Sequence, residues 1–219
     1  MRISTIGVLG LGLFGSSLAR TLAENNVDVI AIDKNMDHVE EVLEDVAVAI
    51  QGDFTKIDHL IEAGFADCDQ AVIAAAEKLE DSILAILNLK KLGIDNITVK
   101  TKSEEYREVI LKVGASRVIL PEVEMGVQVA LMLANPTVHE LFKLDNRYNI
   151  IEFPHQPVWV GKTIAEIDFR NKYNTNIIAI RPIKTHEFTI EFGPDYVVQE
   201  NDLFLGVTTD DNVKNLVKP

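Results

Sequence analysis

Apolar positions in the first 120 residues alternate between short, nearly continuous runs of Val, Ile and Ala and longer stretches with helical spacing. This alternation is typical of repeated βαβ units. The predicted strands are Thr5–Leu9, Val27–Ile32, Val46–Ile50, Gln70–Ala74, Asn96–Val99 and Arg117–Leu120. The predicted helices are Phe14–Glu24, Met36–Glu44, Thr55–Ala63, Glu77–Leu92 and Glu104–Val113. Because the strands lack polar residues at every second position, helices should cover both faces of a parallel sheet. We therefore predict an α/β domain built on a doubly wound, six-stranded sheet.

The pattern changes at Pro121, where prolines and glycines begin to separate shorter elements. Glu122–Leu133 has helical spacing, and Asn135-Pro136 ends that helix, because the residue before a proline disfavours the helical conformation. A second short helix at about Thr137–Leu144 is expected, with Pro136 in its first turn. We divide the chain into an N-terminal domain at 1–134, a connecting helix at 135–145 and a small α+β domain at 146–219.

Composition narrows the class of protein. The formal net charge is −13, which argues against nucleic-acid binding, because phosphate backbones attract clusters of Lys and Arg. Cys68 is the only cysteine, so no intramolecular disulfide or cysteine zinc cluster can form. No stretch reaches the about 18–20 apolar residues of a spanning helix, and the uncharged segment Ile3–Ala19 is too rich in glycine for a signal peptide. We expect a cytoplasmic protein without direct membrane insertion.

The first candidate binding site in the sequence is a glycine-rich motif. Gly10, Gly12 and Gly15 fit the pattern G-x-G-x-x-G between a strand and a helix, where they permit a tight turn, close approach of a pyrophosphate and helix–strand packing. Asp33 stands at the end of the next predicted strand, directly after Ile32 and 21 residues after Gly12, which suits an acid that binds a ribose diol. That carboxylate would repel the 2′-phosphate of NADP. The motif predicts a Rossmann-like nucleotide site and leaves ATP, ADP, AMP and NAD open.

Signals of catalysis are missing from the sequence. It contains no H-E-x-x-H, G-x-S-x-G or Walker-type motif, and none of its five histidines has a catalytic partner near it in sequence. We predict no catalytic residue and no metal site, and interpret the protein as not an enzyme. A small NAD-dependent oxidoreductase or an NAD(H) redox sensor with the same N-terminal fold is the alternative. A nucleotide-binding scaffold for another partner is a third hypothesis.

Several short motifs occur in a characteristic order along residues 5–135. They are Gly10-Leu11-Gly12-x-Phe14-Gly15-x-Ser17, Val29–Asp33, Gly52-Asp53-x-Thr55, Val72–Ala75, Ile97–Lys100, Gly114–Ile119 and Pro121-Glu122-x-x-Met125-Gly126. With them the chain resembles the regulator of potassium conductance (RCK) proteins, in particular the cytosolic regulatory subunits of Ktr/Trk-type potassium uptake systems. Residues Leu141–Pro219 resemble the family's small C-terminal ligand domain.

The resemblance implies a cofactor site for ATP/ADP or NAD(H). Its residues would be Gly10, Gly12, Leu13, Phe14, Gly15, Asp33, Lys34, Asp53, Phe54, Thr55, Ala74, Ala75, Lys100 and Glu122. By this resemblance the glycine loop would hold the phosphates, Asp33 the ribose, and Asp53 and Thr55 would border the adenine. Lys100 would approach the phosphates as a point charge. Glu122, at the ring interface in relatives, would sense the phosphate or bind a cation.

One position departs from the family's pattern. The Ktr-type subunits commonly carry an arginine where this chain has Leu13, and that arginine reaches the terminal phosphate of a neighbouring subunit's nucleotide. Leucine makes no charge-assisted hydrogen bond to a phosphate. The resemblance therefore implies that this chain discriminates less sharply between ATP and ADP.

A second ligand, cyclic di-AMP, is implied for the C-terminal domain. The candidate residues are Ile164, Asp168, Arg170, Asn176, Ile177, Ile178, Pro182 and His186. Arg170 would pair with a phosphate, while the apolar residues pack against the adenines. The residues alone also suit a simpler interpretation, in which Ile164 and Ile167 belong to the core and Arg170 caps a helix.

The family also implies partners. Its subunits form homodimers that assemble into an octameric ring beneath an integral-membrane potassium-translocating subunit. By this resemblance the protein would lie at the inner face of the cell membrane. The segment Glu122–Leu144 would cross to a second copy, and ligands would shift the ring between two shapes that close or open the pore.

Overall fold

The computed structural model describes residues 5–75, 78–134, 140–145, 147–182 and 187–216. The chain forms two compact units, Met1–Val123 and Glu124–Pro219. In the described residues no helix is both long and apolar enough to cross a membrane.

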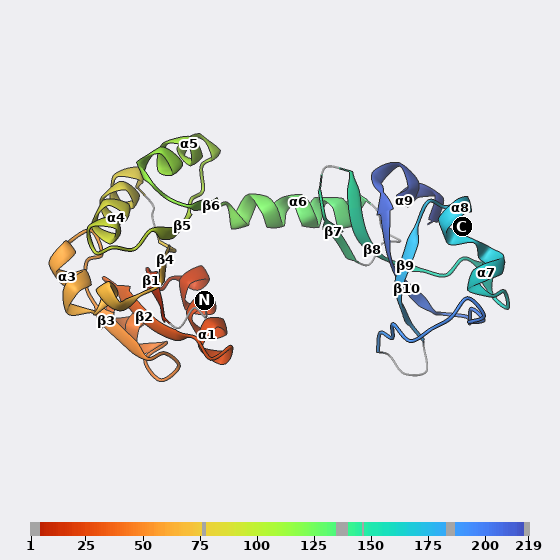
Figure 1. The fold of residues 1–219 in the computed structure, drawn as a ribbon, viewed down its shortest axis with the longest axis horizontal. Coiled ribbons are helices and arrows are strands. Elements are labelled where there is room, and N and C mark those ends of the chain that lie inside the picture. The colour runs from red at the N-terminus through yellow and green to blue at the C-terminus, as the bar shows by residue number, and fades with distance from the viewer. Residues whose placement is uncertain (1–4, 76–77, 135–139, 146, 183–186, 217–219) are drawn as a thin grey trace. The chain divides into compact units, whose positions relative to one another are not determined.

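The first unit contains a six-stranded sheet in the order β3-β2-β1-β4-β5-β6, and each neighbouring pair is parallel (Figure 1). The strands are β1 (Thr5–Leu9), β2 (Asp28–Asp33), β3 (Val48–Gln51), β4 (Gln70–Ile73), β5 (Asn96–Lys100) and β6 (Arg117–Ile119). The helices are α1 (Leu13–Glu24), α2 (Met36–Glu40), α3 (Ile57–Glu62), α4 (Leu79–Lys91) and α5 (Glu104–Val113), with a 3-10 turn η1 (Phe65–Asp67). The predicted doubly wound α/β fold is confirmed.

Apolar side chains on both faces of the sheet explain the unbroken apolar runs. In β2, Ile30 and Ile32 join a core with α3, α4 and α5, whereas Val29 and Ala31 join a second core with α1 and α2. Successive side chains point to opposite faces, so a strand buried on both faces needs apolar residues throughout. The chain order reverses between β1 and β4, which places the carboxyl ends of these two strands beside a crevice.

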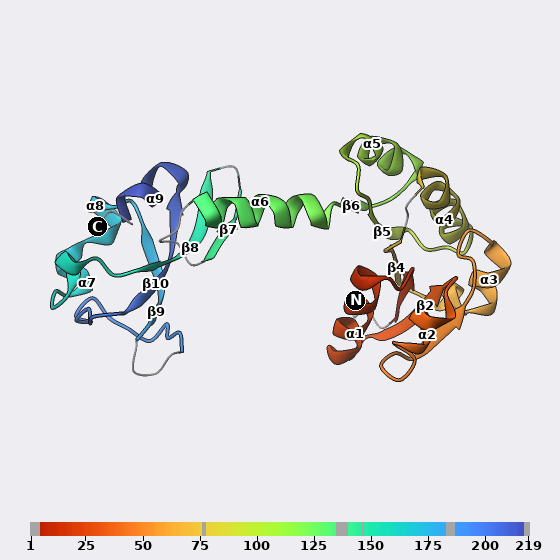
Figure 2. The same cartoon turned by 180° about the vertical axis from the view of Figure 1, so that it is seen from behind.

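The second unit holds an antiparallel sheet in the order β7-β8-β10-β9 (Figure 2). Its strands are β7 (Glu140–Lys143), β8 (Tyr148–Pro154), β9 (Asn176–Arg181) and β10 (Leu203–Thr209). The helices are α6 (Pro121–Ala134), which begins in the first unit, α7 (Ile164–Ile167), α8 (Phe169–Lys172) and α9 (Asp210–Leu216), with a 3-10 turn η2 (Pro157–Trp159). Aromatic side chains form the core around the buried Trp159, whose ring meets those of Phe153, Phe169 and Phe204 edge to face.

One predicted element is wrong. Residues 140–143 of the expected helix Thr137–Leu144 form β7 instead, with Leu141 opposite Ile151 and Phe142 opposite Ile150 of β8. Such a short segment gains little from helix propensity because the first turn is costly to form, so backbone pairing with β8 decides its conformation. Residues 135–139 lie outside the described residues.

Candidate functional site

Each glycine of the loop between β1 and α1 is required for a different physical reason. Gly10 has a φ of +95°, and a Cβ there would lie 2.2 Å from the Cβ of Ala75. A Cβ on Gly15 would lie 1.9 Å from the carbonyl oxygen of Gly10, so its absence lets α1 pack against the loop. A Cβ on Gly12 would meet no atom within 4 Å. Two glycines therefore allow the packing, and the third keeps the backbone accessible.

Helix α1 begins beside this accessible position. Gly12 is its N-cap residue, and its carbonyl accepts the hydrogen bond from the amide of Ser16 at 2.9 Å. The first N–H groups of a helix have no partner within it and carry the positive end of the helix dipole. Gly12, Leu13 and Phe14 line a cavity, so this helix start suits an anionic group.

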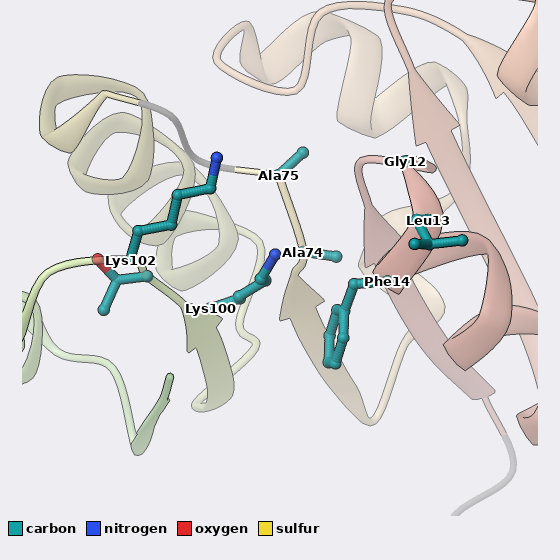
Figure 3. Close-up of a pocket in the computed structure, with 8 residues that line it drawn as sticks. Gly12, Leu13, Phe14, Ala74, Ala75, Lys100 and Lys102 are labelled. Atoms are coloured by element: carbon teal, nitrogen blue, oxygen red, sulfur yellow. The ribbon is translucent and has the colours of Figure 1, made fainter. Parts of the chain in front are cut away.

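That cavity lies between the start of α1 and the ends of β4 and β5, with a volume of about 270 Å³. Its lining residues are Gly12, Leu13, Phe14, Ala74, Ala75, Lys100, Thr101 and Lys102. In Figure 3 the two lysines stand on one side and the glycine loop on the other, with Ala74 and Ala75 between them. The volume is slightly below the about 300–1,000 Å³ of most small-molecule sites, so it suits part of a nucleotide.

Six of the fourteen candidate cofactor residues line this cavity, together with two that the sequence analysis missed. The missed residues, Thr101 and Lys102, directly follow Lys100 at the carboxyl end of β5. Their position was the available signal, because residues just beyond the carboxyl ends of parallel strands form the binding crevice of open α/β sheets.

Asp33, the candidate ribose ligand, lies against the glycine loop. Its Oδ2 accepts a hydrogen bond from the amide of Leu11 at 2.6 Å, and its Oδ1 accepts one from the amide of Asn35 at 2.8 Å. The Nδ1 of His38 lies 3.5 Å from Oδ2. These contacts hold the carboxylate at the end of β2, although Asp33 is not among the residues that line the cavity.

The four candidate residues between Lys34 and Thr55 form a separate cluster. The Asp53 carboxylate accepts hydrogen bonds from the amide of Thr55 at 3.0 Å and from its hydroxyl at 2.6 Å, and Lys34 Nζ lies 3.4 Å away. Burial alone would raise the pKa of Asp53, but these hydrogen bonds and the Lys34 charge together lower it below its usual value. Phe54 is 6% exposed and belongs to the hydrophobic core.

Lys100 lines the cavity and also contacts the first turn of α6. Its Nζ donates to Glu122 Oε1 at 2.8 Å and lies 5.4 Å from the centre of the Phe14 ring. The Lys100 side chain is 15% exposed and that of Glu122 is 53% exposed. The hydrogen bond from Lys100 lowers the pKa of Glu122, so the carboxylate is ionised at neutral pH. Glu122 contacts a lining residue without lining the cavity itself.

A second cavity of about 240 Å³ lies in the C-terminal unit, between α7, α8 and the start of β9. Its lining residues are Ile164, Ala165, Asp168, Phe169, Arg170, Thr175, Asn176, Ile177 and Phe192. Five of the eight candidate residues for a second ligand are among them. Ile178 and Pro182 are not, and His186 lies outside the described residues. Three further lining residues were not predicted from the sequence because they come from separate parts of the chain: Phe169, Thr175 and Phe192.

Asp168 also has a structural role at this second cavity. It adopts a φ of +55° between α7 and α8, and its two carboxylate oxygens accept hydrogen bonds from Asn171 Nδ2 at 2.8 and 3.0 Å. Just before it, Thr163 and Glu166 form the capping box of α7. The local structure therefore presents Arg170 as an exposed cation at the edge of the cavity.

Comparison with known proteins follows the same division of the chain. Residues 6–121 match the model of the TrkA-N domain, and residues 150–218 match that of the TrkA-C domain. The Ktr system potassium uptake protein C of Bacillus subtilis (strain 168) is 33% identical over 174 residues, which are 80% of this chain and 79% of that protein. The Ktr system potassium uptake protein A of the same organism is 31% identical over 196 residues, covering 89% of this chain and 87% of that protein.

Solved structures show the same fold at lower identity. The crystal structure of the GsuK RCK domain aligns with a TM-score of 0.64 at 20% identity and covers 100% of this chain, which spans 48% of that longer chain. The GsuK channel bound to NAD aligns with a TM-score of 0.64 at 20% identity, covering 100% of this chain and 40% of that one.

Proposed function

The chain belongs to the RCK family, with a TrkA-N domain followed by a TrkA-C domain, and from this premise we propose that it regulates a membrane potassium uptake system. Two relatives named as Ktr potassium uptake proteins match most of its length and support this role. The protein would act through ligand-dependent changes of shape rather than catalysis, on an integral-membrane potassium-translocating partner. It would lie in the cytoplasm at the inner face of the membrane.

The regulatory ligand of the first unit would be an adenine nucleotide. The observation that carries this proposal is the cavity where the accessible backbone of Gly12 and the start of α1 face Lys100 and Lys102. A phosphate there meets helix N–H groups on one side and ammonium groups on the other. Asp33 would bind the ribose at the edge of the glycine loop, and the pair Asp53–Thr55 would border the adenine.

Calorimetric titration of the full chain with ATP, ADP, AMP, NAD and NADH tests this proposal. Binding of ATP or ADP supports a gating subunit. Tight binding of NADH alone, or turnover of a substrate with NAD, would favour the redox sensor or oxidoreductase instead. The absence of binding by every nucleotide would refute the proposed site.

Leu13 should influence how strongly the protein distinguishes ATP from ADP. Its side chain is 92% exposed beside the cavity, where the Ktr-type subunits commonly carry an arginine. Because leucine offers no charge to a terminal phosphate, we expect similar affinities for ATP and ADP. A strong preference for ATP would contradict this interpretation, and Leu13→Arg is the variant expected to create one.

Assembly into homodimers and an octameric ring is the proposed context of the site. Helix α6 has no buried residue and exposes the apolar side chains of Val123, Met125, Val127, Val129 and Leu133. An apolar helix surface of this kind favours burial against a second copy. Light scattering on the purified chain would give the number of copies. A monomer at all concentrations would contradict the ring.

Cyclic di-AMP is the proposed ligand of the C-terminal unit. Ile164, Ile177 and the exposed Arg170 at the second cavity combine apolar surface with a cation, which suits a ligand of two adenines and two phosphates. Arg170→Ala should abolish binding without unfolding, because the Arg170 side chain is exposed. Unchanged affinity in that variant would refute the assignment.

A further inference from the structure

Lys100 is connected to two parts of the first unit. As the last residue of β5 it is opposite Ile119 of β6, and α6 begins at Pro121. This register brings Glu122, the second residue of α6, within 2.8 Å of Lys100 Nζ. The same side chain lines the cavity beside the start of α1. One ammonium group is thus shared by the proposed phosphate site and the first turn of α6.

An anion in this cavity would meet the Lys100 ammonium group that already pairs with Glu122. The Glu122 carboxylate is ionised at neutral pH, because Lys100 donates to it and Lys102 adds a second nearby positive charge. Both lysines line the cavity, so a phosphate there would face the same cations. A phosphate and the Glu122 carboxylate bound to the same ammonium group would repel each other, because two negative charges would then lie only a few ångströms apart.

We infer that Glu122 is a competitor built into the site: a phosphate that binds in the cavity takes Lys100 from Glu122, and the first turn of α6 loses its ion pair to β5. This inference rests on the proposed nucleotide site and adds a way for the ligand to act on α6. The helix continues from the first unit into the second, and its residue Leu131 packs against the aromatic core of the second unit.

A double-mutant cycle measures the competition. Glu122→Gln should tighten ADP binding about twofold to fivefold, the range expected for loss of a partly exposed ion pair. The same change in a Lys100→Gln background should leave the affinity unchanged, because the shared ammonium is absent. If Glu122 acted only through its long-range field, the tightening would be equal in both backgrounds, and the inference would be overturned.

Matched controls separate this result from other effects. Glu124→Gln removes a carboxylate from an exposed position on the same helix and should leave ADP affinity unchanged. Adenosine has no phosphate, so its affinity should be the same in all variants that fold. Failure of the wild-type chain to bind ADP would count against the proposed nucleotide site itself rather than against the competition.

Hydrogen exchange provides a second readout, which does not require the Lys100→Gln variant. The ion pair stabilises the start of α6, so amides near Val123 should exchange up to about fivefold faster in Glu122→Gln than in the wild type. ADP should raise the wild-type rate toward that of Glu122→Gln and leave the variant's rate unchanged. Unchanged or slower wild-type exchange with ADP would refute the release of α6.

Discussion

A pair of glycine substitutions tests the loop geometry most directly, because one should weaken ligand binding and the other should lower the stability of the fold. Gly12→Ala and Gly15→Ala each add one methyl group, three residues apart. A Cβ on Gly12 meets nothing within 4 Å, whereas a Cβ on Gly15 lies 1.9 Å from the carbonyl oxygen of Gly10 and 3.2 Å from the Cβ of Ala74. The first change should therefore affect the ligand and the second the fold.

The magnitudes follow from these contacts. Overpacking costs about 1–3 kcal/mol, and the upper end applies to Gly15→Ala because the obstructing atom is backbone. The gain in helix propensity from Gly to Ala returns about 1 kcal/mol, which leaves a loss of about 2 kcal/mol. Gly12 has φ −62° and ψ −176°, a conformation open to alanine. Its substitution should cost less than about 1 kcal/mol as an N-cap change.

Scanning calorimetry and ADP titration together measure both effects. A loss of about 2 kcal/mol in Gly15→Ala lowers the melting temperature by about 5–10 °C. Gly12→Ala should melt near the wild-type temperature and bind ADP at least about tenfold more weakly, because its methyl group occupies the path of the phosphates. Wild-type melting of Gly15→Ala would refute the close approach of α1 to the loop. Wild-type ADP affinity in Gly12→Ala would refute phosphate contact with Gly12.

Three further predictions concern other parts of the molecule. Lys102→Gln should weaken ADP binding about fivefold and leave adenosine binding unchanged, because Lys102 lines the cavity as a cation; equal effects on both ligands in calorimetry would contradict this. Asp53→Asn should lower stability by up to about 1 kcal/mol at pH 7. Because the pKa of Asp53 is depressed in the folded state, urea titrations should show this difference shrinking as the pH falls through and below 3.8, whereas a constant difference would oppose the argument. Phe204→Ala should destabilise the second unit by about 3–5 kcal/mol, detected by fluorescence of Trp159, the chain's single tryptophan, with the exposed Ile178→Ala as a control that should change little.

Local sequence signals predicted much of the first unit because its features repeat or have a single physical cause. Strands such as β2 must be apolar on both faces, so their pattern was visible without knowledge of their neighbours. The glycine spacing likewise predicted a turn, an accessible backbone and a helix contact, and the structure shows one of these at each glycine.

Other features of the structure depend on contacts between residues far apart in the chain, which local sequence patterns do not reveal. Residues 140–143 form a strand because β8 lies beside them, and nothing within that short segment favours a strand strongly. Phe54 occurs among candidate binding residues in the sequence but packs in the hydrophobic core. Lys102 has no motif of its own, and only the fold places it opposite the glycine loop.

Periodicity and backbone constraints within a few residues were enough to predict the βαβ pattern, the glycine loop and the acidic residue Asp33 at the carboxyl end of a strand. The set of side chains that share the cavity, and the ion pair between Lys100 and Glu122, became visible only in the folded structure. Those contacts depend on the order of the strands and on their register, which bring together residues far apart in the chain. The physical reason is that a side chain's partners are set by packing in three dimensions, whereas its secondary structure is largely encoded by its near neighbours in sequence.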